Sequence, residues 1–474
     1  MSEMKKLFNW FHTSIRSLQR INNSRTLVLI FVLTITITTG AAQPLAAMSL
    51  SATDKVDEGC TYMIPTNVSE VNGQENYKQV KPGDVLCLQA GERDNLKLIN
   101  LHGEPGKKII VRNSNGTTTI SGNLYLNGGI SIYASSFLRL TGTGVGTQCG
   151  ALYSTEEQKC GIVVSGIQKG IWISTEQELE TPHDLEIDHV WVSDTSKETK
   201  TRGIAIHPGL GQLISGLYIH HNYVARTLAE GIYMGTEPHG QPYESLGKIQ
   251  NLEVSYNLVE QTGYDGIKVK VAIQNVKVHH NVIHDAGLSN TPAHQGGIKI
   301  AMTDGLFYNN YVTNALEGIR SNRPLDRMTE ARYFNNIVVN TRSVGIEAAE
   351  EGALIFNNTV VTCGDSGIVG DAKTAQVFNN IVAECTGKPV KAKYGENGTL
   401  QKFNNLVGSI DSIGFVNPAQ GDYHLLQQSK AIDAGKIGPN PLTYDYEDLH
   451  RPEGRGVDIG AFEYQVNIDS GDEQ

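Results

Sequence analysis

The chain has 474 residues, with 50 glycines, 19% charged residues and a formal net charge of −11. This composition fits a soluble, turn-rich globular protein. The negative charge argues against a nucleic acid as the partner, because phosphate backbones are bound by clustered cations.

Residues 1–42 have the features of a signal peptide. Basic residues come first, an apolar run of 13 residues follows at 27–39, and small residues stand at 40–42. This run is shorter than the ~20 residues that cross a bilayer as a helix, so we expect cleavage after Ala42. An uncleaved membrane anchor is the alternative. We expect a processed protein without a membrane span that is secreted, periplasmic or held at the cell surface.

Residues 43–110 are expected to cap the N-terminus and to lead into a repeated region at 111–410. Each repeat opens with a Gly-Ile step and closes with an Asn followed by apolar residues. The Gly-Ile steps begin at Gly203, Gly231, Gly266, Gly297, Gly318, Gly345 and Gly367. The closing residues are Asn222, Asn257, Asn281, Asn310, Asn336, Asn358, Asn380 and Asn405.

The period and the apolar pattern of these repeats predict the fold. Asn336, Asn358 and Asn380 are 22 residues apart, and apolar residues alternate within a repeat, as at Leu252 and Val254. Short strands repeated at such a period indicate a solenoid. Because crossovers between parallel strands are nearly always right-handed, the sequence predicts an all-β, right-handed parallel β-helix.

An Asn at one place in every repeat predicts a column of stacked amides. Amides ~4.8 Å apart can hydrogen-bond to their neighbours along the column. A second column lies two residues before the last ladder asparagines and consists of Phe334, Phe356, Phe378 and Phe403. Packing under a loop is the plain interpretation of these rings, and a sugar-binding platform is the alternative.

The repeat pattern stops near residue 410. Residues 411–464 are expected to form a C-terminal cap, since an open strand edge invites pairing with other chains. The polar and acidic residues 465–474 are expected to be a disordered tail.

Export would place the six cysteines in a compartment where disulfides form. The expected pairs are Cys60–Cys87, Cys149–Cys160 and Cys363–Cys385. The last pair is separated by one repeat, so its members lie on neighbouring strands within the reach of a disulfide. Free buried thiols are the alternative.

The motif Lys81-Pro82-Gly83-Asp84, the repeats and the ending at 458–464 resemble secreted bacterial right-handed β-helix proteins of the pectate-lyase-like superfamily. The N-terminal stretch is similar to that of polysaccharide lyases that act on alginate and chondroitin-type glycans. We therefore expect a monomer whose partner is an acidic polysaccharide.

Charged residues fall into columns along the strands that begin with Gly-Ile. If each Ile points inward, the next residue points outward. The outward column reads Ala205, Tyr233, Lys268, Lys299, Arg320, Glu347 and Val369. A parallel column two residues on reads His207, Lys270 and Asn322. An acidic column one residue before each Gly reads Glu230, Asp265 and Glu317.

The repeats before Asn336 are longer than those after it, with additional residues at 235–248, 287–296 and 322–332. Long loops above a rigid scaffold often carry function, so we expect a cleft beside the Gly-Ile strands. Neutral insertions are the alternative. The expected substrate-binding residues are Tyr233, Lys270, His207, His239, His294, Asn322 and Arg323.

Three stacked cations in a chain of negative charge suggest β-elimination on a uronate. The reaction requires a neutralised carboxylate, a base for the C5 proton and an acid for the leaving oxygen. Neighbouring cations lower the pKa of a lysine, so Lys299 or Lys268 is the expected base. Arg320 would pair with the substrate carboxylate or assist the leaving group.

The resemblance implies that a Lys base precedes an Arg by about one repeat, as Lys299 precedes Arg320. It also implies acidic calcium ligands shortly before the Lys, but the segment 290–297 contains no carboxylate. Asp265 and Glu230 are therefore the candidate ligands if calcium is a cofactor.

Three other functions remain open from the residues. A glycoside hydrolase would need two carboxyls roughly 5–10 Å apart. A uronate epimerase would begin with the same proton abstraction as a lyase. A non-catalytic adhesin or glycan-binding scaffold would use the long face without chemistry.

Overall fold

The computed structural model describes residues 59–122, 128–144, 161–166, 169–176, 178–195, 201–236, 240–323, 331–370, 374–393 and 400–465. The predicted signal peptide, the pair Cys149–Cys160, His239 and the tail beyond 465 lie outside these residues. Residues 59–418 and 422–465, which form the coils and most of the C-terminal segment described below, belong to one compact unit.

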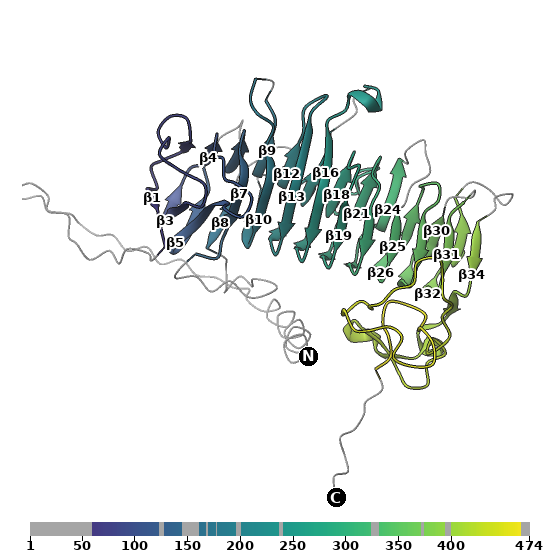
Figure 1. Ribbon diagram of the computed structural model, residues 1–474. Helices are drawn as coiled ribbons and strands as arrows, with labels where there is room; N and C mark the ends of the chain where they lie inside the picture. The colour runs from purple at the N-terminus through teal and green to yellow at the C-terminus, as the bar shows by residue number, and fades with distance from the viewer. Residues whose placement is uncertain are drawn as a thin grey trace, which may run out of the picture. The chain divides into compact units, whose positions relative to one another are not determined.

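The chain forms a right-handed parallel β-helix, as the repeats predicted (Figure 1). From β12 onward, each coil crosses a 12-stranded parallel sheet once and a 23-stranded parallel sheet twice. The 12-stranded sheet contains β2 (Glu70–Asn72), β4 (Leu96–Ile99), β6 (Ile130–Tyr133), β9 (Lys169–Ser174), β12 (Arg202–His207), β15 (Ile232–Met234), β18 (Ile267–Lys270), β21 (Gly296–Ala301), β24 (Glu317–Arg323), β27 (Ile346–Ala348), β30 (Ile368–Gly370) and β33 (Val390–Ala392).

The 23-stranded sheet carries the other two strands of each coil. Its strands are β1 (Tyr62–Ile64), β3 (Val85–Arg93), β5 (Ile109–Ile120), β7 (Ser136–Thr141), β8 (Ile162–Ser165), β10 (His183–Asp188), β11 (Val190–Ser193), β13 (Leu213–His220), β14 (Tyr223–Ala225), β16 (Lys248–Ser255), β17 (Leu258–Glu260), β19 (Val276–His279), β20 (Val282–His284), β22 (Leu306–Tyr308), β23 (Tyr311–Thr313), β25 (Arg332–Phe334), β26 (Ile337–Thr341), β28 (Leu354–Phe356), β29 (Thr359–Cys363), β31 (Gln376–Phe378), β32 (Ile381–Cys385), β34 (Gln401–Phe403) and β35 (Leu406–Gly408).

A few short elements stand outside these sheets. They are an antiparallel pair, β36 (Phe415–Asn417) and β37 (Asp422–Leu425), the helix α2 (Ile410–Ile413) and two 3-10 turns, η1 (Tyr243–Ser245) and η2 (Pro418–Gln420). None of the helices in the described part of the chain is long and apolar enough to cross a membrane.

The Gly-Ile step has a simple steric origin. The Ile side chains point into the coil, where Ile267, Ile298 and Ile319 are fully buried. There is no room for a side chain at the preceding position, because a Cβ at Gly297 would lie 2.2 Å from Cγ1 of Val312. Only glycine fits there. The step therefore fixes which neighbouring residues point outward, and with them the register of the charged columns.

The predicted asparagine column is present and buried. Asn336 donates its Nδ2 to Oδ1 of Asn358 at 2.9 Å, and Asn358 donates in turn to Asn380 at 2.9 Å. The same side chains also hydrogen-bond to backbone groups at the bend, for example from Asn358 Nδ2 to the Tyr333 carbonyl at 2.9 Å. The predicted Phe column is also present, and the ring centroids of Phe356 and Phe378 are 5.0 Å apart.

The C-terminal segment lies along the bends of the last coils, where it appears in yellow-green in Figure 1. A second set of asparagines, each one residue before the ladder, holds it by donating side-chain hydrogen bonds to its backbone carbonyls. Asn335 donates to Tyr444 at 3.0 Å, and Asn357 donates to Asp458 at 2.9 Å. The segment packs on side chains of these coils that include Ile337, Val361 and Ile381, and its role as a cap stays a prediction.

Two of the predicted disulfides, Cys60–Cys87 and Cys363–Cys385, are present. Strands β1 and β3, inside the region 43–110 expected to cap the coil, already pair in parallel register. The domain boundaries themselves stay predictions.

Replacing Asn358 by Ala should lower the free energy of unfolding by about 3–5 kcal/mol, because several buried backbone and amide groups lose their partners at about 1–3 kcal/mol each. Chemical denaturation of the purified protein measures this loss. The matched control is Asn417→Ala, at an exposed position of β36, which should change stability by less than about 0.5 kcal/mol. Equal effects of the two substitutions would contradict the ladder's role.

Candidate functional site

The three predicted cations lie in one column on the outer face of the 12-stranded sheet. Lys268 of β18 pairs in register with Lys299 of β21, and Lys299 pairs with Arg320 of β24. The column ends on Glu347 of β27, which pairs with Arg320. The structure therefore brings together the residues that the Gly-Ile register predicted to be neighbours.

The column is not an exposed cationic ladder. Lys268 is 4% exposed and Lys299 is 2% exposed, whereas the Arg320 side chain is 28% exposed. Glu230, Asp265 and Glu317 of the predicted acidic column neutralise these cations. Burial of several lysines on one sheet face requires such carboxylates, because an unpaired buried charge is strongly destabilising.

Lys268 sits between two buried carboxylates. Its Nζ lies 3.1 Å from Oε1 of Glu230, 3.0 Å from Oδ2 of Asp265 and 2.9 Å from Nδ1 of His294. Burial alone would lower the pKa of Lys268, but the charges of Asp265 and Glu230 outweigh burial and raise it. Lys268 is thus held as a charged ammonium.

Lys299 has the opposite character. Its Nζ lies 3.3 Å from Oε2 of Glu317. Burial lowers the pKa of Lys299 to about 8, with Asp265 opposing the shift and Arg320 and Lys268 adding to it. The neighbouring-cation effect expected from the sequence is present, and burial is the larger cause. A lysine with this pKa is largely deprotonated in mildly alkaline solution, which suits a general base.

Arg320 lies at the solvent side of the column. It forms an ion pair with Glu317, and its Nε lies 3.0 Å from Oε2 of Glu347. Glu347 is also bound by Lys393, whose Nζ lies 2.9 Å from Oε1. The guanidinium is therefore oriented by two carboxylates and remains partly accessible to an anion in solution.

The predicted substrate-binding residues lie in different surroundings. His294 and His207 are half-buried, and the His294 side chain is 31% exposed beside Lys268. Tyr233 and Lys270 are buried, so in the free protein neither side chain is accessible for the direct substrate contact that was predicted. Asn322 and Arg323 lie in β24, but the predicted column of Lys270 and Asn322 is wrong, because a register shift after Ile300 pairs Ala301, the neighbour of Lys270, with Arg323. The side chains of Asn322 and Arg323 are outside the described part of the chain.

Two cations that were not predicted lie at the N-terminal end of this face. Lys169 and Arg202 occupy the positions that Glu230, Asp265 and Glu317 hold in later coils, one residue before a glycine. The step Gly170-Ile171 was the available signal, since it matches the motif used for the other coils.

The residues present do not fit the calcium site that the sequence suggested. Glu230, Asp265 and His294 converge closely enough to surround an ion. However, Ca²⁺ takes six to eight oxygen ligands, and here two carboxylates face the ammonium of Lys268 instead. Lys268 supplies the positive charge that calcium would bring.

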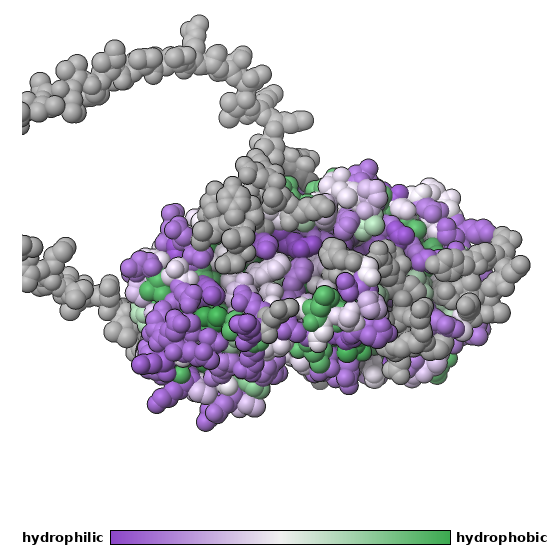
Figure 2. Space-filling view, turned by 90° about the horizontal axis from the view of Figure 1, so that it is seen from above, coloured by the Kyte–Doolittle hydropathy of each residue, from purple (hydrophilic) through white to green (hydrophobic). Residues whose placement is uncertain are grey.

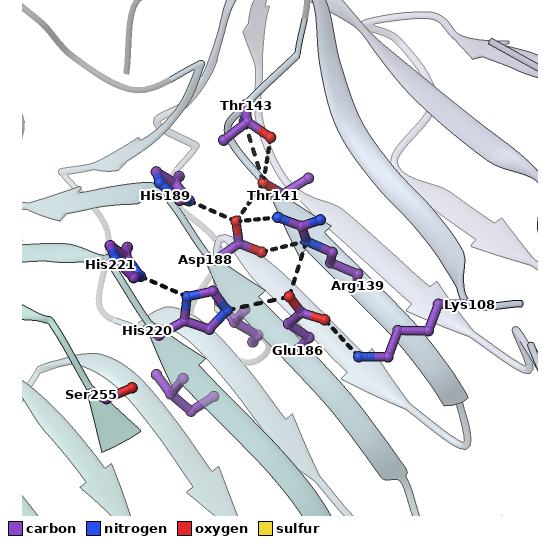
Figure 3. A network of polar contacts seen from close by, with 12 residues as sticks. Lys108, Arg139, Thr141, Thr143, Glu186, Asp188, His189, His220, His221 and Ser255 are labelled. Atoms are coloured by element: carbon purple, nitrogen blue, oxygen red, sulfur yellow. Dashed lines mark hydrogen bonds and ion pairs between the residues drawn. The ribbon is translucent and has the colours of Figure 1, made fainter. Parts of the chain in front are cut away.

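A second acidic cluster lies on the 23-stranded sheet (Figure 3). Arg139 donates two hydrogen bonds to Asp188, at 2.7 and 2.8 Å, and Lys108 lies 2.5 Å from Glu186. Burial would raise the pKa of Glu186, but hydrogen bonds from His220 and Lys108 lower it to about 2. Since two cations already neutralise the two carboxylates, this network serves the structure rather than a metal.

A groove of about 940 Å³ also lies on the 23-stranded sheet, and none of the predicted site residues lines it. Charged residues of both signs line it, including the exposed Lys277 and the half-buried Glu253. On the face seen in Figure 2, hydrophilic residues cover much of the described surface, and the hydrophobic areas between them are small. Within the described residues, the groove lacks the buried lysines and carboxylates found around Lys299.

Comparisons with known proteins give structural likenesses only. No family model and no curated protein sequence matches the chain. A pectate lyase structure shares 12% identity at a TM-score of 0.46, covering 86% of this chain and 97% of its own. An alginate lyase from a Paenibacillus species shares 13% identity at a TM-score of 0.40, covering 74% of this chain and 100% of its own. The A-module of a mannuronan C-5 epimerase from Azotobacter vinelandii shares 13% identity at 0.42, covering 69% and 88%. Values this low identify no activity for this chain.

Replacing Lys268 by Met should destabilise the protein by about 3–5 kcal/mol, because two buried carboxylates lose their shared cation. Thermal or chemical denaturation at neutral pH measures the loss. Lys277→Met, at an exposed position of β19, is the control and should change stability little. If both variants unfold at the same denaturant concentration, Lys268 does not neutralise Glu230 and Asp265 as described.

Proposed function

We propose that the protein is an exported polysaccharide lyase that cleaves an acidic, uronate-containing glycan by β-elimination. The observation that carries the proposal is the contrast between two stacked lysines. Burial lowers the pKa of Lys299 to about 8, while Asp265 and Glu230 keep neighbouring Lys268 charged. One outer face thus offers a base beside fixed positive charge, which is what elimination on a uronate requires.

In the proposed reaction, Lys299 Nζ takes the proton from C5 of the uronate. The electrons of that C–H bond form the C4–C5 double bond, and the bond from C4 to the glycosidic oxygen breaks. The ammonium of Lys299 then returns a proton to the departing oxygen, so the lysine is regenerated. Arg320 binds the carboxylate on C5 and stabilises the charge that develops there.

Substrate binding has to open the ion pairs that cover Lys299. Arg320 is the partly exposed member of the column, and its present partners are Glu317 and Glu347. A uronate carboxylate would replace one of these partners on the guanidinium. Movement of Arg320 toward the substrate would then release the surface above Lys299 Nζ. The two disulfides support the export in this proposal, since such bonds persist in oxidising compartments.

Glycoside hydrolysis is a second candidate, favoured by the pair Glu230 and Asp265. Burial raises the pKa of Asp265, whereas bonds from His294, Arg202 and Lys268 lower the pKa of Glu230 despite its burial. Two close carboxyls with divergent pKa values are the arrangement used by retaining glycosidases. Both carboxyls are fully buried and share Lys268, which makes this candidate the weaker one.

The lyase proposal predicts an unsaturated product that absorbs ultraviolet light when the protein is incubated with its polyuronate. A panel of alginate, pectate and chondroitin would identify the glycan. Lys299→Met should lower kcat by about 10²–10⁴-fold, because the base is lost while the side-chain volume is kept. Lys277→Met, on the other sheet, should leave kcat unchanged. New reducing ends without ultraviolet absorbance would indicate hydrolysis, altered uronates without cleavage would indicate epimerisation, and binding without products would indicate a scaffold.

The pH dependence provides a separate test of the base. Lys299 accepts a proton only when it is neutral, so kcat/KM should rise with pH and level off above about 8, the pKa of Lys299. The profile is measured with the identified glycan at constant ionic strength. A rate that stays constant between pH 6 and pH 9, or that falls across that range, would rule out Lys299 as the base.

A further inference from the structure

The outer face that carries Lys299 continues over earlier coils, and there the charge before the glycine changes sign. In two later coils, the position before the glycine is acidic and the ladder position is cationic, with Asp265 before Lys268 and Glu317 before Arg320. In β9 and β12 the position before glycine is cationic, with Lys169 and Arg202 paired in register. In β9, the aromatic residue Trp172 occupies the ladder position that Lys268 occupies in β18.

Aromatic rings form a continuous stack beside these cations. The ring of Trp172 lies 4.4 Å from that of His207, and His207 lies 4.7 Å from Tyr233. Lys169 Nζ lies 3.7 Å from the centre of the Trp172 ring, and the Arg202 guanidinium lies 4.0 Å from that of Tyr233. Each cation is thus held over a ring, which fixes its position without neutralising its charge.

The two cations differ in their counter-charges. Arg202 pairs with Glu230 at 2.9 Å. Within the described residues, Lys169 forms no ion pair with a carboxylate, and its recorded contact is with Trp172. Burial lowers the pKa of Lys169, and the charge of Arg202 lowers it further. Among the described residues, Lys169 is therefore a cation without a carboxylate partner on this face, in a chain whose net charge is −11.

We propose that Lys169, Trp172 and Arg202 form an anion-binding subsite that holds a carboxylate or sulfate of the glycan, several sugars away from the bond that is cleaved. Lys169 supplies the charge, and the half-buried rings of Trp172 and His207, whose faces stack on each other, offer their outer edges to a sugar ring. Four coil steps separate β9 from β21, which places the subsite ~19 Å from Lys299 at about 4.8 Å per step. The inference rests on the proposed function, since it assumes that the glycan lies along this face.

Lys169→Met tests the subsite, and Lys97→Met is its matched control. Lys97 lies on the same sheet and over a ring, 5.7 Å from the centre of Tyr133, but it is paired with Glu70 at 3.4 Å. Affinity of the full-length protein for alginate and for pectate would be measured by affinity electrophoresis. Whichever polymer the wild type binds, Lys169→Met should bind it roughly tenfold more weakly, the cost of losing one charged hydrogen bond. The control should bind it as the wild type does.

Substrate length separates this inference from the lyase proposal. With uronate hexamers, Lys169→Met should raise KM roughly tenfold at unchanged kcat, whereas trimers, too short to span both places, should give wild-type values. Loss of polymer affinity in Lys169→Met without any unsaturated product from the wild type would support the subsite and overturn the lyase. Wild-type affinity in Lys169→Met, or no binding of either polymer by the wild type, would overturn the subsite.

Discussion

The structure depends on one constraint, the in-register stacking of parallel coils. Neighbouring coils lie about 4.8 Å apart, which is the spacing of strands in a sheet. Buried asparagines hold that register, with Asn336, Asn358 and Asn380 bonded amide to amide at the same bend. The glycine before an inward-pointing Ile provides space for a neighbouring side chain, as Gly297 does for Val312. A residue at one position of a coil therefore meets the residue at the same position in the next coil, except where the register shifts, as between Ile300 and Ala301.

Because of this constraint, charged residues at equivalent positions of successive coils form columns. The register brings Lys268, Lys299 and Arg320 close together. The carboxylates of Glu230, Asp265 and Glu317 form ion pairs with these cations and offset their mutual repulsion. The pairing is unequal. Lys268 has two carboxylates and stays charged, while Lys299 has one carboxylate oxygen at 3.3 Å and a pKa lowered to about 8. A scaffold that repeats its geometry thus creates two different lysines.

Much of this arrangement was predictable, because register follows from the sequence in a parallel coil. The Gly-Ile steps placed Lys268 beside Lys299 and Arg320, and the spacing of 22 placed Cys363 beside Cys385. Burial was not predictable, since it depends on how far long side chains reach between coils. Lys268 appeared to be an exposed cation or a base, and its two carboxylates appeared to be calcium ligands. Lys169 and Trp172 were not predicted because the predicted columns begin at Gly203, one coil after the step Gly170-Ile171.

The column holds Lys299, which can lose its proton in mildly alkaline solution, beside Lys268, which stays protonated. The most direct test is a nuclear magnetic resonance titration of the full chain with isotope-labelled, dimethylated lysines, assigned with Lys299→Met and Lys268→Met. We expect the Lys299 signal to titrate near pH 8, and the Lys268 signal to titrate above its ordinary value of 10.5. A Lys299 signal that titrates near 10.5, like an exposed lysine, would contradict the account.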